Sequence, residues 1–345
     1  MKMIRLTAFL LGSLSLIIGA RAQESVAEFY KGKQINIIVG SSTGGGYDLY
    51  ARHLARHLGK HVPGTPTVIV QNMPGAGGLA ATNHLYARAP RDGLTFGIVQ
   101  GTLTFAQLAK APQAMFDMQK FGWLGSANMT SNVCVFSPRA KVQNARDLLE
   151  KEILVGASGG STDFVPNLLN ALVGTKFKVI KGYKATTEIL PAIERDEVDG
   201  LCGWGWDGAQ VNGRDYLDRG VVSVGLESGT ERHPELAAKG VPFMLDLVAN
   251  EETKKVLRFL FSYLVYVRPF ITPPEVPTDR LDALQRAFAA TLKDPDFVAE
   301  AEKAGVEIRY ISPDQAKAAL ADALDAPQPV KERGLEELKN AGWRF

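Results

Sequence analysis

The chain has 345 residues, of which 46% are hydrophobic and 22% are charged. That length corresponds to about two domains, and the composition excludes a disordered chain, a collagen and a polytopic membrane protein. With 39 Lys and Arg against 37 Asp and Glu, the net charge of +2 is too balanced to indicate a nucleic-acid-binding protein. Two cysteines are too few for a disulfide framework or a four-thiolate zinc site.

The first 22 residues have the pattern of a secretory signal peptide. Lys2 and Arg5 provide a basic start, residues 6–18 form an apolar run, and Ala20-Arg21-Ala22 fits the small-x-small rule for cleavage. An uncleaved anchor is the alternative, but the run is short for a transmembrane helix. No Cys follows it, which disfavours a lipoprotein anchor. We therefore predict cleavage after Ala22 and an exported protein.

Short apolar runs alternate with helical patterns along the rest of the chain. The pattern after the first run places Tyr47, Ala51, Leu54 and Leu58 on one helix face, and Gly59 ends that helix. The alternation continues to residue 99 and predicts a mostly parallel sheet covered by helices. The predicted strands are 34–40, 67–70 and 94–99, and the predicted helices are 47–58 and 79–88.

The alternation then restarts, which indicates a second α/β lobe. Its predicted strands are 132–136, 153–156, 177–180, 199–202 and 221–224, and its predicted helices are 162–172 and 187–195. The tail has helical patterns at 251–263, 278–292 and 296–304, and a strand-like pattern at 263–267. Ser312 and Gln315 then form a capping box with Pro313 at the first helical position. We expect this helical tail to pack back on the first lobe.

Two glycine-rich loops share one pattern. Residues 39–48 (VGSSTGGGYD) and 155–163 (VGASGGSTD) each follow a buried strand and open a helix. Glycines let consecutive N–H groups point into one space, and a helix N-terminus adds about half a positive charge. Ligands of open α/β sheets bind at the carboxyl ends of strands, so two such loops facing each other predict a clamp for a small anion. The alternative is that both are plain turns, with Asp48 and Asp163 as helix caps.

A third glycine cluster, at residues 74–80, contains the G-x-G-x-x-A pattern of dinucleotide-binding loops. It follows the second strand, and no acidic residue ends a strand about 20 residues further on, as dinucleotide binding requires. We therefore interpret this cluster as a structural turn beside the cleft, and we expect no cofactor.

Several of these stretches resemble one family. Ile37-Ile38-Val39 before Gly44-Gly45-Gly46-Tyr47-Asp48, then residues 68–78 (VIVQNMPGAGG) and 89–93 (APRDG), are similar to the extracytoplasmic solute receptors of tripartite tricarboxylate transporters, the Bug receptor family. The resemblance spans residues 28–320 and is weaker after residue 120. The chain departs from the family at Thr43, where Pro is usual, and at Gly182-Tyr183-Lys184-Ala185, where the family has Pro-Tyr-Lys-Gly.

The resemblance implies an α/β fold of the periplasmic-binding-protein type 2: two lobes, each a mixed, mostly parallel sheet flanked by helices, with the ligand cleft between them. It puts the first lobe at residues 23–128 and 228–345 and the second at 129–227. It further implies a periplasmic, monomeric receptor without catalysis, cofactor, metal or nucleic acid. Such a receptor captures a small organic carboxylate and delivers it to the membrane subunits of a secondary transporter. A ligand-dependent sensor that uses the same cleft is an alternative.

The loops and the resemblance together give the candidate ligand-binding residues. They are Ser42, Thr43, Gly44, Gly45, Tyr47, Asp48, Gly101 and Thr102 in the first lobe, and Ser158, Gly159, Gly160, Ser161, Tyr183 and Trp204 in the second. In the family that the chain resembles, backbone amides and ordered waters typically hold the carboxylate. Such contacts leave little side-chain code, so the sequence does not name the carboxylate.

A secreted serine hydrolase is the main rival function. Residues 156–160 fit the G-x-S-x-G turn with Ser158 as the nucleophile. A hydrolase also needs a later acid and a later histidine, and only His233 follows, in a predicted loop. We therefore favour a ligand contact for Ser158.

Three histidines, His53, His57 and His61, lie on or just after the first predicted helix at a spacing that could bind a metal. No acid joins them in the sequence, and nearby basic residues such as Arg56 and Lys60 disfavour a cation. We therefore interpret this group as a solvated helix face and expect no metal.

Trp204, Trp206 and Arg268 each have two interpretations. The tryptophans follow the predicted strand 199–202, so they either pack the lobe or form an aromatic wall for the ligand. Arg268 either supports a chain crossover or meets the ligand.

The two cysteines lie in strands that are neighbours in the two-crossover topology implied by the resemblance. We therefore expect Cys134 and Cys202 to lie close together, about 5 Å apart if the register matches. Export permits a disulfide. Neighbouring strands match disulfide geometry only in some registers, so the sequence leaves the bond open.

Overall fold

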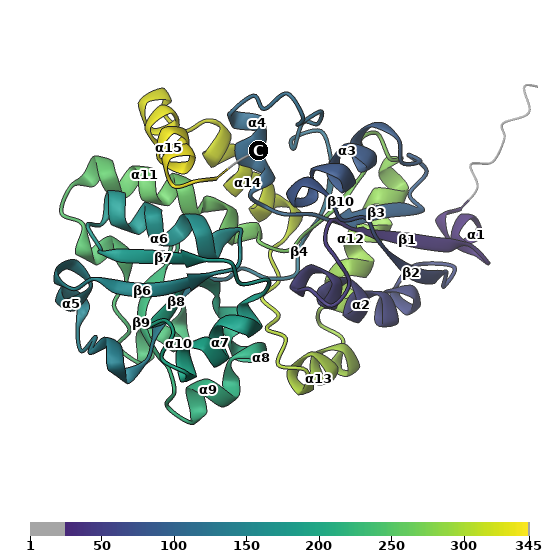
Figure 1. The fold of residues 1–345 in the computed structure, drawn as a ribbon. Helices are drawn as coiled ribbons and strands as arrows, with labels where there is room; N and C mark the ends of the chain where they lie inside the picture. Colours follow the sequence, from purple (N-terminus) through teal and green to yellow (C-terminus); the bar gives the residue numbers. More distant parts are fainter. Residues whose placement is uncertain (1–24, 344–345) are drawn as a thin grey trace, which may run out of the picture.

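The computed structural model describes residues 25–343, and the predicted signal peptide at residues 1–22 lies outside them. The chain forms two lobes side by side, each built around one five-stranded sheet (Figure 1). Within the described residues, no helix has both the length and the apolar character that crossing a membrane requires.

The first sheet has the strand order β2-β1-β3-β10-β4. β1 pairs in parallel with β2 and β3, whereas β10 runs antiparallel between β3 and β4. Ile35, Ile37 and Val39 of β1 are fully buried because this strand lies inside the sheet with helices over it. The strands are β1 (Gln34–Val39), β2 (Thr67–Asn72), β3 (Thr95–Ile98), β4 (Gly122–Ser126) and β10 (Pro269–Thr272).

The second sheet repeats this plan with the order β7-β6-β8-β5-β9. β6 pairs in parallel with β7 and β8, and β5 runs antiparallel between β8 and β9. The strands are β5 (Asn132–Phe136), β6 (Ile153–Ala157), β7 (Phe177–Lys181), β8 (Gly200–Gly205) and β9 (Ser223–Ser228).

One antiparallel strand in each sheet reveals the connection between the lobes. The chain enters β5 directly after leaving the first sheet at β4, and it enters β10 after returning from the second sheet. Each entering strand takes the same fourth position in its sheet. Two crossovers of this kind confirm the two-lobed α/β fold with mixed, mostly parallel sheets.

Helices cover both sheets. Those against the first sheet are α1 (Val26–Tyr30), α2 (Gly46–Leu58), α3 (Leu79–Ala87), α4 (Leu103–Leu108), α12 (Thr278–Thr291), α13 (Pro295–Lys303) and α14 (Pro313–Leu324). Those on the side of the second sheet are α5 (Ala145–Glu150), α6 (Ser161–Leu172), α7 (Thr186–Glu194), α8 (Trp206–Asn212), α9 (Arg214–Asp218), α10 (Pro234–Ala238), α11 (Glu251–Phe261) and α15 (Gln328–Asn340).

The sequence pattern identifies most strands but misses β4 and β10. β4 contains two glycines and β10 begins at Pro269, and both residue types weaken a strand signal. The strand-like pattern at 263–267 is wrong, because residues Ser262–Tyr266 form a 3-10 helix. The apolar side chains of this segment, among them Tyr263 and Leu264, are buried in the core. Burial requires apolar residues in a strand and in a 3-10 helix alike, so the pattern does not distinguish the two.

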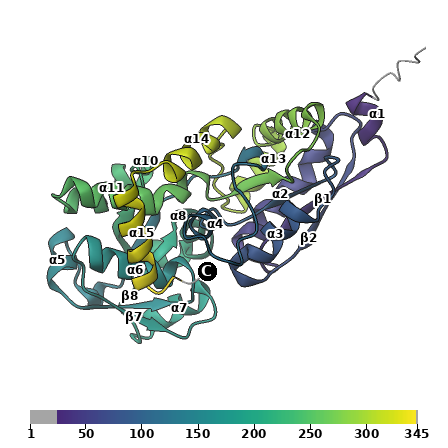
Figure 2. The same cartoon turned by 90° about the horizontal axis from the view of Figure 1, so that it is seen from above.

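The helical tail divides between the lobes. α12 and α13 pack on α2, and α14 packs on β4, as the sequence predicts. α15 instead lies beside α6 and α11 (Figure 2). Because α11 also lies on the side of the second sheet, the expectation that the whole tail returns to the first lobe is wrong for these two helices. Gly334 of α15 faces the ring of Phe259 on α11, and the missing side chain lets the two helices approach closely.

Residues after β9 continue along the second sheet. Glu227 forms a bridge with Phe243, and Leu236 and Val241 join the apolar cluster that contains side chains of β5 and β8. We therefore propose that the chain returns to the first lobe at residues 262–268 instead of at residue 228.

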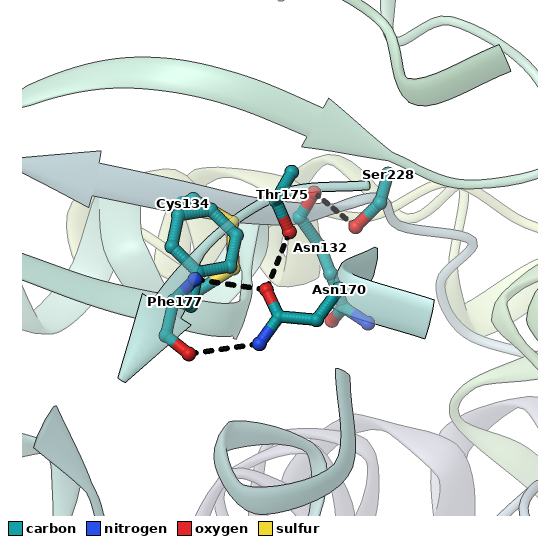
Figure 3. Close-up of a disulfide and its surroundings, with 7 residues drawn as sticks. Asn132, Cys134, Asn170, Thr175, Phe177 and Ser228 are labelled. Carbon is teal, nitrogen blue, oxygen red and sulfur yellow. Dashed lines mark hydrogen bonds between the residues drawn. A yellow bond between two sulfur atoms is a disulfide. The ribbon is translucent and has the colours of Figure 1, made fainter. Parts of the chain in front are cut away.

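A disulfide joins the neighbouring strands β5 and β8 of the second sheet (Figure 3). Cys134 and Cys202 have Cα atoms 3.9 Å apart, which confirms the predicted proximity. They face each other where the β5–β8 register shifts between Val133 and Val135, and both side chains are fully buried. In the same view, the Asn170 amide accepts from Phe177 N at 2.8 Å and fixes the start of β7.

Removing this disulfide lowers stability. The bond closes a loop of 68 residues, for which chain-entropy arguments give about 4 kcal/mol. We expect the free energy of unfolding of a Cys134→Ala/Cys202→Ala variant, measured in guanidinium chloride, to fall by about this amount. Reductant should destabilise the parent protein and leave the double variant unchanged. Alkylation of both thiols in the unfolded, unreduced parent, seen by mass spectrometry, would contradict the bond.

Candidate functional site

A cavity of about 510 Å³ lies between the two lobes. Its wall contains the starts of α3 and α4 from the first lobe and the starts of α6 and α8 from the second. Each of these helices follows a parallel strand, so the carboxyl ends of the parallel strands from both sheets meet at this cavity. This is the position at which open α/β sheets bind ligands.

The helices at the cavity begin without side-chain caps. The N-cap residues of α3, α4, α6 and α8 are Gly78, Thr102, Gly160 and Gly205, and none accepts a hydrogen bond from its helix through a side chain. The first N–H groups of a helix have no partner inside the helix. Some have partners outside the helix, since Leu103 N of α4 donates to Gln100 O and Trp206 N of α8 donates to Ser131 O. The remaining groups and the helix dipoles favour an anion at the cavity.

The two glycine-rich loops are built alike. Gly44 N donates to Asp48 Oδ2 at 2.8 Å in the first loop, and Gly159 N donates to Asp163 Oδ1 at 3.2 Å in the second. In both, an aspartate four residues after a glycine fixes the turn. Gly44, Gly159 and Gly160 have φ values of 84°, 96° and 60°, a region that favours glycine.

Asp48 stabilises the first loop from inside the lobe. Its carboxylate also accepts from Arg52 Nε at 2.9 Å and from Asn72 Nδ2 at 2.9 Å. Although burial raises the pKa of Asp48, the hydrogen bonds from Arg52, Gly44 and Asn72 bring that pKa below its ordinary value. Asp48 therefore fixes the loop from the first turn of α2, whose N-cap is Gly45 and has no side-chain cap.

The structure brings only part of the predicted set to the cavity. Tyr47, Thr102, Gly160 and Ser161 line it, and Gly44 and Gly45 line a smaller hollow of about 70 Å³ between the lobes. The other predicted residues line neither space: Ser42, Thr43, Asp48, Gly101, Ser158, Gly159, Tyr183 and Trp204. Trp204 is buried in the apolar cluster of the second lobe, as the packing interpretation predicts.

Sequence reasoning left the role of Arg268 open and missed its partner. Arg268 Nη2 of the first lobe donates to Asp207 Oδ2 of α8, in the second lobe, at 2.7 Å. The two side chains are only 12% and 4% exposed, and both line the cavity. Although burial lowers the pKa of Arg268, the Asp207 carboxylate raises it above its ordinary value overall. Arg268 therefore stays charged and joins the two lobes.

The aromatic surroundings fix the arginine further. The guanidinium lies over the rings of Tyr47 and Tyr50, at 4.5 and 5.2 Å from their centres. Arg268 Nε and Asp207 Oδ1 are buried and have no hydrogen-bond partner within residues 25–343. One signal could have found Asp207: it directly follows the unusual Gly-Trp-Gly-Trp stretch at the end of a strand.

The hydrolase constellation is not assembled. His233 Nε2 pairs with Glu307 Oε1 at 2.8 Å, and His233 N donates to Glu227 Oε1 at 2.6 Å. Ser158 N donates to Thr162 Oγ1, and no hydrogen bond joins Ser158 to His233 in the described part of the chain. Without a base beside it, the Ser158 hydroxyl is not an activated nucleophile.

The histidine face of α2 packs against α13, so the prediction of a solvated face is wrong. His57 Nε2 lies 2.6 Å from Glu300 Oε2, and His61 Nε2 lies 2.7 Å from Asp294 Oδ2. These acids lie more than 230 residues away in sequence, so no local pattern could show them. Across residues 25–343, no group of three or more His, Cys, Asp and Glu side chains has the arrangement of a metal site.

Solved structures share this fold. A TctC solute-binding protein from Polaromonas is 14% identical, with a TM-score of 0.65 over 90% of this chain and 99% of that chain. The periplasmic binding protein BugD is 22% identical (TM-score 0.59, 91% and 99% covered). MatC from Rhodopseudomonas palustris, solved with malate, is 18% identical (TM-score 0.59, 89% and 99% covered). No protein-family model and no curated protein matches the chain.

These comparisons define the class of fold. The chain has the two-lobed architecture of the TctC and Bug periplasmic binding proteins along most of its length. The structural neighbours confirm the fold that the sequence resemblance implies.

Breaking the Arg268–Asp207 pair is expected to lower the free energy of unfolding. Asp207→Ala leaves a buried guanidinium without a counter-charge, so we expect a loss of about 3–5 kcal/mol in the free energy of unfolding in urea. The exposed pair of Arg214 and Asp218, 3.0 Å apart, provides the control. Asp218→Ala should cost about 0.2–1 kcal/mol. Equal losses in the two variants would contradict the buried pairing.

The contact between α2 and α13 predicts a pH effect. Hydrogen bonds from Arg56 and His57 lower the pKa of Glu300 from 4.5 to about 2. A depressed carboxyl pKa stabilises the fold above the ordinary pKa, and this contribution disappears as the pH falls from about 4.5 to about 2. We expect Glu300→Gln to be less stable than the parent at pH 7 and equally stable near pH 2, in urea unfolding. Glu302→Gln, at an exposed position of the same helix, is the control; a gap for Glu300→Gln that stays constant with pH would contradict this linkage.

Proposed function

We propose that the protein is a periplasmic solute-binding receptor. It captures a small organic carboxylate between its lobes and delivers it to the membrane subunits of a tripartite tricarboxylate-type transporter. It acts as a monomer and performs no catalysis. The predicted signal peptide supports export, and the two-lobed fold with a central cavity supports capture.

One observation carries this proposal: helices from both lobes begin at one cavity without side-chain caps. A carboxylate has four lone-pair positions and can accept from several such amides at once. The cation at the cavity, Arg268, is already paired with Asp207, so the anion is held mainly by backbone groups. MatC, which shares the fold, was solved with malate, and this agrees with a carboxylate ligand.

We propose that Thr102, Gly160, Ser161 and Tyr47 contact the ligand. The first three start helices at the cavity, and the Tyr47 ring lies beside the Arg268 guanidinium. Of the remaining predicted residues, Asp48 and Gly159 take part in the hydrogen bonds that fix the two loops. A ligand that touches both lobes favours their closed arrangement, because it binds that arrangement more tightly.

The second glycine-rich loop offers a direct test. Gly160 has a φ of 60° and open space around its Cα, so Gly160→Val strains the turn and puts methyl groups in the cavity. In a thermal-shift screen of malate, adipate, benzoate and 3-phenylpropanoate, at least one acid should stabilise the parent. We expect Gly160→Val to lower the affinity for that acid at least about tenfold, or 1.4 kcal/mol.

Gly220→Val is the matched control. Gly220 has a φ of 70° and equally open surroundings, but it precedes β9 and does not line the cavity. It should cost similar stability and leave binding unchanged. The proposal fails if none of the acids stabilises the parent, or if both variants bind the acid as the parent does.

A further inference from the structure

The cavity has an apolar side as well as a polar one. Leu103 of α4, Leu79 of α3 and Phe164 of α6 line it and belong to the largest apolar cluster of the protein. Trp343, which follows α15, lines the cavity and packs against the same cluster. This side of the cavity is therefore a continuation of the core.

Trp343 is held in place by the end of α15. Gly342 N donates to Lys339 O at 3.1 Å and Trp343 N to Leu338 O at 3.0 Å, the hydrogen-bond pattern of a Schellman motif with Gly342 at a φ of 89°. Asn167 of α6 donates to Ala341 O at 3.2 Å. The tryptophan position is therefore set by the backbone of a helix that packs on the second lobe.

The indole reaches the first lobe. Its ring meets the ring of Phe105 on α4 edge to face, with centres 5.9 Å apart. Phe105 in turn contacts Phe259 and Tyr263 in the same way. Trp343 thus forms an aromatic wall at the cavity where α4 of one lobe meets α15 of the other.

Among the described residues, the polar side of the cavity provides no unpaired cationic side chain for a second anionic group. The charged side chains that line the cavity, within the described residues, are Arg268, Asp207 and Asp163. Arg268 is paired with Asp207, and Asp163 accepts from Gly159 N and lies 3.3 Å from Lys181. A dicarboxylate would bring a second charge that no unpaired cationic side chain among these residues meets, and burying that charge against the apolar wall is unfavourable.

The volume of the cavity also disfavours a small dicarboxylate. The cavity measures about 510 Å³. It falls in the range of cavities that hold drug-sized ligands, roughly 300–1,000 Å³. A four-carbon acid would leave much of the apolar wall in contact with water.

We propose that the receptor is selective for monocarboxylates that carry an apolar, ring-containing body, such as arylalkanoic acids. The carboxylate sits at the start of α6, at Gly160 and Ser161, and the ring packs against Trp343 and Phe164. Aromatic side chains bind such rings through large apolar area and edge-to-face contact. This inference rests on the proposed receptor function and names its ligand class.

Calorimetry with defined acids tests the selectivity. We expect 3-phenylpropanoate to bind at least about tenfold more tightly than adipate or malate, a difference of about 1.4 kcal/mol. Trp343→Ala should weaken 3-phenylpropanoate about tenfold and leave adipate unchanged, whereas Trp343→Phe should retain the preference. Because Trp343→Ala could loosen α15, Trp343→Phe keeps the test valid if the alanine variant is unstable.

Fluorescence supplies a second readout. Trp123, Trp204 and Trp206 are at most 5% exposed, whereas Trp343 is partly exposed at the cavity. Adding 3-phenylpropanoate should change the tryptophan emission of the parent, and this change should vanish in Trp343→Phe although binding persists in calorimetry. A purely structural role for Trp343 would leave the emission change intact.

The outcomes separate this inference from the receptor function. If adipate or malate binds more tightly than 3-phenylpropanoate, and Trp343→Ala binds both acids as the parent does, the selectivity is wrong and the receptor function stands. If none of these acids binds the parent, the receptor function fails as well.

Discussion

The cleft depends on one constraint: a helix that follows a parallel strand begins at the edge where that strand ends. In both sheets this edge faces the other lobe, so the starts of α3, α4, α6 and α8 share one cavity. Glycine at three of the four N-caps removes the side chain that would otherwise satisfy the first N–H groups. Backbone and side-chain oxygens of nearby loops accept from the first N–H groups of α4 and α8, so the groups left for water or a ligand are mainly those at the start of α6. The affinity for an anion is therefore a property of the backbone arrangement more than of any single side chain.

The two lobes are joined both by charged contacts and by aromatic contacts. Arg268 and Glu307 of the first lobe pair with Asp207 and His233 of the second. The aromatic contacts are made by Phe105 of α4, which meets α11 and the end of α15. Because each contact joins the lobes, rotation of one lobe against the other must preserve these pairs or exchange them for contacts with the ligand. The Arg268–Asp207 pair and Trp343 all line the cavity, so contacts that join the lobes also supply its polar and its apolar lining.

The sequence predicts local features well and distant contacts poorly. The runs around Ile37 and Val155 identify the parallel strands β1 and β6, and the glycine-rich loops after them identify the cavity edge. Asp207, Tyr263 and Trp343 could not be placed in the same way, because they reach the cavity from segments far apart in sequence. The acids that contact the histidines of α2 come from another helix for the same reason.

The aspartates of the two loops show a subtler limit. Asp48 and Asp163 stand in the repeated pattern beside the cavity, so a sequence pattern cannot separate a residue that shapes a loop from one that contacts a ligand. The structure shows that both carboxylates shape their loops, because they accept from Gly44 N and Gly159 N, and that only Asp163 also lines the cavity. Trp343 shows the converse. The position of Trp343 is set by a short local motif, Gly342 at the end of α15. Its role at the cavity depends on its contact with α4 of the other lobe. A ligand that touches this ring and the amides of α6 contacts the cavity at both its apolar and its polar side. Its affinity then depends on how the two lobes are placed, and this links the choice of ligand to the arrangement of the lobes.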